Sequence, residues 1–191
     1  RTDNNPYGPD ITEKRFMAYH AIIHGATGIF FYTWDVEEYR PSGCEVPPPG
    51  CYGDARSPSF WETTKAVATE LKTMTPILVS PTQTISVTTN PAIDTLVKEY
   101  NGQKYLIAAN RHNSATSATF DATQLWPGEI SIDVLFEGRI LAIPSGYLTD
   151  DFAPYDVHVY GPLLSLIDSI PPTSNNPSDQ TYFVGDLAAI P

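Results

Sequence analysis

The acidic residues Asp35, Glu37 and Glu38 form a cluster just after the apolar run at residues 29–32, and their carboxyl groups could carry out acid–base chemistry. Two carboxyl groups can share such work when they face one substrate from different sides. Glu37 and Glu38 are adjacent in the sequence, and adjacent side chains usually point apart. We therefore interpret this pair as solvated charges of a loop.

His20 and His24 lie four residues apart, which places both imidazoles on one face of a helix. That spacing can bind a metal ion, but Ala21, Ile22 and Ile23 between them offer no carboxylate, unlike the helix of a zinc protease. We expect the two histidines to pack or cap near a sheet, and we expect no metal site. The sequence contains no nucleophile elbow, P-loop or dinucleotide fingerprint, so it predicts no cofactor.

Cys44 and Cys51 are the two cysteines of the chain and lie in a proline-rich segment. The six residues between them are not a usual zinc spacing. We predict a local disulfide, with two free thiols as the alternative. A disulfide would indicate an oxidising, extracellular compartment.

Helical periodicity and capping signals define the elements that must position these residues. Asp10 and Glu13 form a capping box before a predicted helix over residues 12–24. The apolar run at residues 29–32 does not alternate, which is typical of a strand buried on both faces. A second capping box at Ser59–Glu62 predicts a helix over residues 59–74, which we expect Pro76 to end.

Beyond Pro81 the sequence alternates between short strands and turns, which is the signature of an antiparallel sandwich or small barrel. Asn101-Gly102 is a strong signal for a two-residue hairpin. The predicted strands are residues 85–88, 95–100, 104–109, 118–122, 130–136, 139–143, 147–152 and 157–160. The sequence therefore predicts an α/β part over residues 1–80, a β-sandwich over residues 81–162, and a linker or C-terminal extension over residues 163–191.

The composition limits the classes of partner. The net charge is −11, with only 11 basic residues, which argues against binding of nucleic acid. No run of about 18 apolar residues is present, so we expect no membrane span. The low content of charged residues, 17%, together with many Tyr, Thr, Ser and Asn residues, is a hint of neutral ligands rich in hydroxyl groups.

One pattern carries a resemblance to a known family. It is Arg15-Phe16-x-x-Tyr19-x-Ala21-Ile22-x-x-Gly25-Ala26-x-Gly28-Ile29-x-x-Tyr32-x-Trp34. This pattern resembles the last helix–strand step of (β/α)₈ glycoside hydrolases, in the large retaining group of β-galactosidases, xylosidases and endoglucanases. The region after Pro81 is similar to the β-sandwich that often follows such barrels.

The resemblance implies that residues 12–24 are the seventh barrel helix, residues 28–34 the eighth strand and residues 59–74 the eighth helix. It also implies that the two catalytic glutamates end barrel strands four and seven, outside this chain. Residues at the carboxyl end of strand eight face the active-site mouth, so Tyr32, Trp34 and Asp35 are the candidate sugar-binding residues. The alternatives are a loop-anchoring Trp34 and an Asp35 that only caps the loop.

Two functions are compatible with these features. The first is the C-terminal part of a secreted glycoside hydrolase that uses a retaining double displacement. Its partners would be a carbohydrate substrate and the rest of the barrel, either upstream in the same polypeptide or in another chain. The second is a non-catalytic β-sandwich module for carbohydrate binding or assembly. Five tyrosines of the sandwich could form a sugar platform, but cross-strand packing is the more common role of such residues: Tyr100, Tyr105, Tyr147, Tyr155 and Tyr160.

Overall fold

The structure is a computed structural model that describes residues 9–31, 56–88 and 90–163. In these residues it contains two α-helices, one short 3₁₀-helix and mostly antiparallel sheet. Among them, no helix has the length and apolar character needed to cross a membrane. The elements are α1 (Ile11–Ile23), α2 (Arg56–Leu78), β1 (Thr82–Gln83), β2 (Ile93–Tyr100), β3 (Gln103–Asn110), β4 (Thr116–Asp121), β5 (Ser131–Val134), β6 (Arg139–Ala142), η2 (Pro144–Gly146), β7 (Tyr147–Phe152) and β8 (Val157–Gly161).

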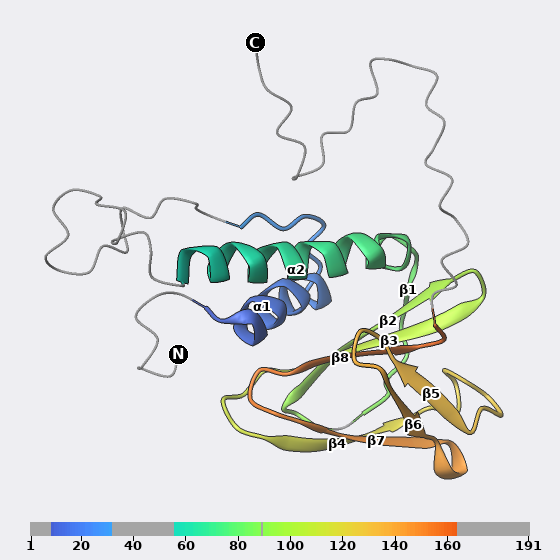
Figure 1. Ribbon diagram of the computed structural model, residues 1–191. Helices are drawn as coiled ribbons and strands as arrows, with labels where there is room; N and C mark the ends of the chain where they lie inside the picture. The colour runs from blue at the N-terminus through green and yellow to red at the C-terminus, as the bar shows by residue number, and fades with distance from the viewer. Residues whose placement is uncertain (1–8, 32–55, 89, 164–191) are drawn as a thin grey trace, which may run out of the picture.

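The elements form three layers, with the larger sheet in the middle (Figure 1). This sheet has the strand order β1-β2-β3-β8-β5-β6, and all its pairings are antiparallel. The two-stranded sheet β4-β7 covers one face, and α1 and α2 lie side by side over the other. The prediction of an antiparallel sandwich is confirmed, and the helices pack directly onto it.

Strand β3 shows how the middle sheet is held, because six consecutive residues of it are buried. Leu106 and Ala108 belong to the core between the two sheets, whereas Ile107 and Ala109 belong to the core under the helices. Successive side chains of a strand point to opposite faces, so a strand covered on both sides needs an unbroken apolar run. The sequence Leu-Ile-Ala-Ala supplies that run.

A capping box marks the start of α1, and packing against the sheet helps to set the end of α2. Asp10 and Glu13 form the predicted capping box, with Glu13 N donating to Asp10 Oδ1 at 2.9 Å. Two predictions for α2 are wrong: the helix begins at Arg56 rather than at Ser59, and it continues through Pro76 to Leu78. A proline removes one helical hydrogen bond, and the fully buried Ile77 helps to hold the last turn against the sheet.

The hairpin prediction at Asn101-Gly102 is confirmed. Both residues have positive φ, 51° and 74°, as a type I′ turn requires, and Tyr100 pairs with Gln103 across them. The predicted strand at residues 85–88 is absent. Val87 is buried, but its carbonyl accepts an isolated hydrogen bond from Asp121 N instead of joining a ladder.

The predicted buried strand at residues 28–34 is not formed in its described part. Residues 28–31 are in no strand, and the side chain of Phe30 is 96% exposed. An unalternating apolar strand is stable only between neighbouring strands that supply hydrogen bonds and cover both faces. No strand of the described residues lies against this segment. The strand that is buried on both faces is β3 instead.

A buried polar network fastens the two sheets to each other. Arg139 of β6 donates two parallel hydrogen bonds to Asp150 of β7, at 2.8 and 2.7 Å, and a third to Glu137 at 2.7 Å. Tyr160 OH also donates to Asp150, at 2.9 Å, and His158 Nδ1 lies 2.6 Å from Glu137. Asp150 is therefore held in an ion pair that joins the two sheets.

Two carboxylates of the network are held in their charged form. Burial alone would raise the pKa of Asp150, but hydrogen bonds from Arg139 and Tyr160 outweigh it and lower that pKa. Burial likewise opposes the lowered pKa of Glu137, and hydrogen bonds from His158 and Arg139 again prevail. A carboxyl whose folded pKa is depressed stabilises the fold above its unfolded pKa, about 4, and loses that contribution as the pH falls through the folded value.

We expect Asp150→Asn to lower the free energy of unfolding by about 2–3 kcal/mol at pH 7, because the Arg139 guanidinium loses its bidentate charged acceptor and keeps only Glu137. The measurement is urea denaturation followed by circular dichroism. The difference from the unaltered protein should shrink as the pH falls from 5 toward 2, because the wild-type carboxylate is then also neutralised.

The neighbouring substitution Asp151→Asn is the matched control. Asp151 is exposed on the other face of β7, so its substitution should change the free energy of unfolding by less than about 0.5 kcal/mol. Equal effects of the two substitutions, or a difference independent of pH, would contradict this role of Asp150.

Candidate functional site

The residues that the sequence singled out for sugar binding lie outside the described residues. These are Tyr32, Trp34 and Asp35, and the predicted disulfide of Cys44 and Cys51 lies outside them as well.

One group of polar side chains near the helices is the helix–sheet contact, formed by Arg15, Tyr19, Glu70 and the carbonyl of Val157. Arg15 Nε of α1 donates to both carboxylate oxygens of Glu70 of α2, at 2.9 and 3.0 Å. Its Nη1 donates to the carbonyl of Val157 in β8. One guanidinium thus joins both helices and the middle sheet.

Tyr19 completes this contact from the same helix face. Its hydroxyl donates to Glu70 Oε1 at 2.8 Å, and the Arg15 guanidinium lies 5.4 Å from the centre of its ring. Burial, and then the Glu70 carboxylate, raise the pKa of Tyr19 well above its ordinary value. The phenol therefore stays protonated and serves as a hydrogen-bond donor rather than a base.

A second group, the His–Asp cluster, lies at the other end of α1 and consists of His20, His24 and Asp94. His20 Nε2 and His24 Nε2 lie 3.1 and 3.4 Å from the same oxygen, Oδ2 of Asp94 in β2. The Nη1 atom of Arg111 lies 3.6 Å from the other oxygen, Oδ1. The expected packing of the histidines near a sheet is what the structure has, and the fold adds a carboxylate to them.

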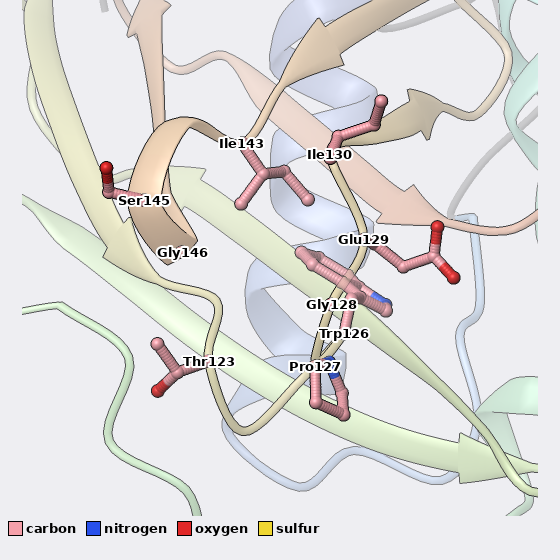
Figure 2. Close-up of a pocket in the computed structure, with 9 residues that line it drawn as sticks. All are labelled: Thr123, Trp126, Pro127, Gly128, Glu129, Ile130, Ile143, Ser145 and Gly146. Carbon is pink, nitrogen blue, oxygen red and sulfur yellow. The ribbon is translucent and has the colours of Figure 1, made fainter.

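The pocket in Figure 2 has a volume of about 410 Å³ and lies between the β4–β5 segment and the turn before β7. Its aromatic residue, Trp126, is only 5% exposed, and its indole Nε1 donates to the carbonyl of Lys104 at 2.9 Å. A sugar stacks on an aromatic face that is open to solvent, so this indole is a core residue rather than a stacking platform. The pocket is lined by Thr123, Trp126, Pro127, Gly128, Glu129, Ile130, Ile143, Ser145 and Gly146.

The tyrosines of the sandwich do not form a shared platform. Tyr105 is 4% exposed and Tyr160 is fully buried, in cores on opposite faces of the middle sheet. Tyr155 packs its ring against Phe16 of α1, at 5.2 Å between centroids. Packing, the more common role, accounts for these three residues.

Three carboxyl groups have pKa values below their ordinary range, which is the wrong direction for a general acid near neutral pH. They are Asp121, whose pKa is lowered by hydrogen bonds from Thr123, and the network residues Glu137 and Asp150. These groups suit electrostatic stabilisation of the fold and not proton donation to a substrate.

Sequence reasoning missed Glu70 and Asp94, although each carries a signal. Glu70 falls between Val67 and Met74 on the buried stripe of α2, where a carboxylate must have a partner. Asp94 lies inside a strand, where Asp is rare. Both signals indicate a buried or half-buried charge, but neither identifies the partner.

Comparison with known proteins gives partial structural likenesses only. The sequence matches no protein-family model and no curated protein. Two similar solved structures are AmyP in complex with maltose and a variant of AmyP in complex with maltotriose, each with 9% identity and a TM-score of 0.47 over 56% of this chain. A third is a Bacteroides fragilis protein provisionally assigned as an α-galactosidase, with 17% identity and a TM-score of 0.40 over 56% of this chain.

The chain spans about a fifth of the length of the chains in these three structures, 21–22%. AmyP is bound to a sugar in both of its structures, and the Bacteroides fragilis protein carries an assigned activity on a sugar. Likenesses of this size do not assign the chain to a family.

Proposed function

We propose that this chain forms the last helices and the β-sandwich of a longer, secreted glycoside hydrolase. In this proposal the sandwich fixes the two helices that close the barrel, and the two catalytic glutamates of a retaining double displacement lie outside these 191 residues. Tyr32, Trp34 and Asp35 follow α1 in the sequence and would line the sugar site.

The observation that carries the proposal is the helix–sheet contact. Arg15 and Tyr19 are the two polar positions at the start of the pattern that resembles the last helix–strand step of the barrel. Both bind Glu70 of α2, and Arg15 also binds the backbone of β8. Both helices thereby pack against the middle sheet of the sandwich. This contact supports the proposal because an accessory domain that holds the last helices of a barrel needs such an arrangement.

The charged side chains of this contact are largely shielded from solvent, which suits a permanent attachment of the two helices to the sheet. The side chains of Arg15 and Glu70 are only 16% and 14% exposed, so salt screens them weakly. Around them, Tyr19, Met74 and Ile77 pack with Ile107, Val157 and Val159 in one apolar cluster. The apolar burial supplies most of the free energy, and the ion pair fixes the orientation of α1 on α2.

Removing the charge of Glu70 tests how much the helix–sheet contact contributes to the free energy of unfolding. Glu70→Gln leaves Arg15 largely buried beside a neutral amide, so we expect the free energy of unfolding to fall by about 2–4 kcal/mol in urea denaturation. Glu62→Gln is the matched control on the same helix, because Glu62 is 61% exposed and pairs with Lys65 at the surface. The control should lose less than about 0.5 kcal/mol, and equal losses would remove the contact from its structural role.

The catalytic proposal is tested by comparing two purified proteins. We expect the 191-residue chain to hydrolyse none of the aryl-β-galactoside, aryl-β-xyloside and aryl-β-cellobioside substrates, and we expect the complete gene product to hydrolyse at least one. Proton NMR of the first product should show retention of anomeric configuration. Turnover by the isolated chain would mean that the catalytic residues are misplaced, and an inactive complete gene product would favour the non-catalytic module.

Substitution of Trp34 tests the sugar site in the complete gene product. Loss of a stacking surface worth about 1.4 kcal/mol corresponds to a tenfold loss of affinity, so Trp34→Ala should lower kcat/KM by about that factor. Tyr147→Ala is the control, because Tyr147 is an aromatic residue of the sandwich that is 50% exposed. An unchanged kcat/KM in Trp34→Ala would remove Trp34 from the site.

A further inference from the structure

We propose that the His–Asp cluster of His20, His24 and Asp94 is a binding site for a divalent transition-metal ion, with Zn²⁺ as the best candidate, and that the ion would clamp α1 to β2. Two imidazole nitrogens and one carboxylate oxygen meet there, and the three ligand atoms all lie within 4.8 Å of one another. This inference does not depend on the proposed catalytic function.

The distances fit a tetrahedral ion. With metal–ligand bonds of about 2.0–2.2 Å, two ligand atoms of a tetrahedral Zn²⁺ lie about 3.3 Å apart. The Nε2 atoms of His20 and His24 lie 3.1 and 3.4 Å from Asp94 Oδ2. Both nitrogens therefore already lie at ligand spacing from the carboxylate oxygen.

The fold positions the three ligands from two elements. The spacing of four residues places both histidines on one face of α1, with ring centroids 4.5 Å apart. His20 is further held by Phe16, whose ring stacks on it at 4.9 Å between centroids and at 28°. Asp94 faces them from β2, and its side chain is 17% exposed.

The carboxylate that the helix lacks thus comes from Asp94, which lies 74 residues after His20 and 70 residues after His24 in the sequence. The sequence predicts no metal site because the residues between the two histidines offer no carboxylate. Tertiary packing brings the third ligand, which no local pattern reveals.

Arg111 is the cation that faces the cluster, and it determines how Asp94 can be used. Its Nη1 lies 3.6 Å from Oδ1, whereas the two histidines contact Oδ2. Oδ2 therefore remains for the metal, and Arg111 would orient the carboxylate from behind, as partners of metal ligands commonly do. The Arg111 side chain is 46% exposed, so solvent moderates its repulsion of a bound ion.

The ligand set selects the class of ion. Imidazole nitrogen favours Zn²⁺, Cu²⁺, Ni²⁺ and Co²⁺, whereas Ca²⁺ and Mg²⁺ take oxygen ligands. Three protein ligands leave a fourth position of a tetrahedron for water. The side chain of His24 is 57% exposed, so this position can open to solvent.

The experiment titrates the metal-free, 191-residue chain with Zn²⁺ by calorimetry and with Co²⁺ by visible absorption. We expect one equivalent to bind, with the d–d bands of low-coordinate Co²⁺. A Zn²⁺ concentration one hundred times Kd should raise Tm by roughly 5–10 °C, and Mg²⁺ should not. His24→Ala and Asp94→Asn should each weaken binding by at least about tenfold, because each removes one of three ligands.

Two controls make the test specific. His112→Ala alters an exposed histidine outside the cluster and should bind Zn²⁺ as the unaltered chain does. The double variant Cys44→Ser, Cys51→Ser should also retain binding, which separates this site from the thiols. The proposal is overturned if the unaltered chain binds no Zn²⁺, if His24→Ala and Asp94→Asn, each folded by circular dichroism, bind normally, or if binding is lost only with the cysteines.

Discussion

The ion pair of Arg15 and Glu70 is the constraint on which the arrangement of the layers depends. Its guanidinium reaches both oxygens of the carboxylate on α2 and also the backbone carbonyl of Val157 in β8. A half-buried charge is costly unless every partner is in place, so α1, α2 and β8 must adopt one mutual position to satisfy it. Apolar packing drives the helices onto the sheet, but it is non-directional, and the ion pair supplies the direction.

The middle sheet gives these contacts their scaffold. Because helices cover one face of it and β4-β7 covers the other, β3 and β8 are buried on both sides. On the far face, the pair of Arg139 and Asp150 plays a part like that of Arg15 and Glu70, since it fixes β6 to β7 across the two sheets. Each interface of the three layers thus combines an apolar cluster with one arginine–carboxylate pair. The pair of Arg139 and Asp150 is bidentate, so its planar geometry also sets the orientation of the two strands.

Much of the local structure could be predicted from particular residues. The capping box at Asp10 and Glu13, the turn at Asn101-Gly102 and the strand at residues 147–152 depend on backbone conformation and on alternation over a few positions. The failures come from long-range effects. Pro76 predicts the end of a helix, but α2 continues to Leu78 with Ile77 fully buried. The apolar run at residues 28–31 is not a strand, because no described strand lies beside it.

The sequence by itself determined most of the elements, the antiparallel character of the second part and the face that the two histidines share, because these follow from the periods of the helix and the strand. Only the tertiary structure decided which charges meet. Glu70 and Asp94 lie 55 and 74 residues from their partners Arg15 and His20. No local pattern encodes such pairs, because they form only when packing of the helices on the middle sheet closes the long segments between them.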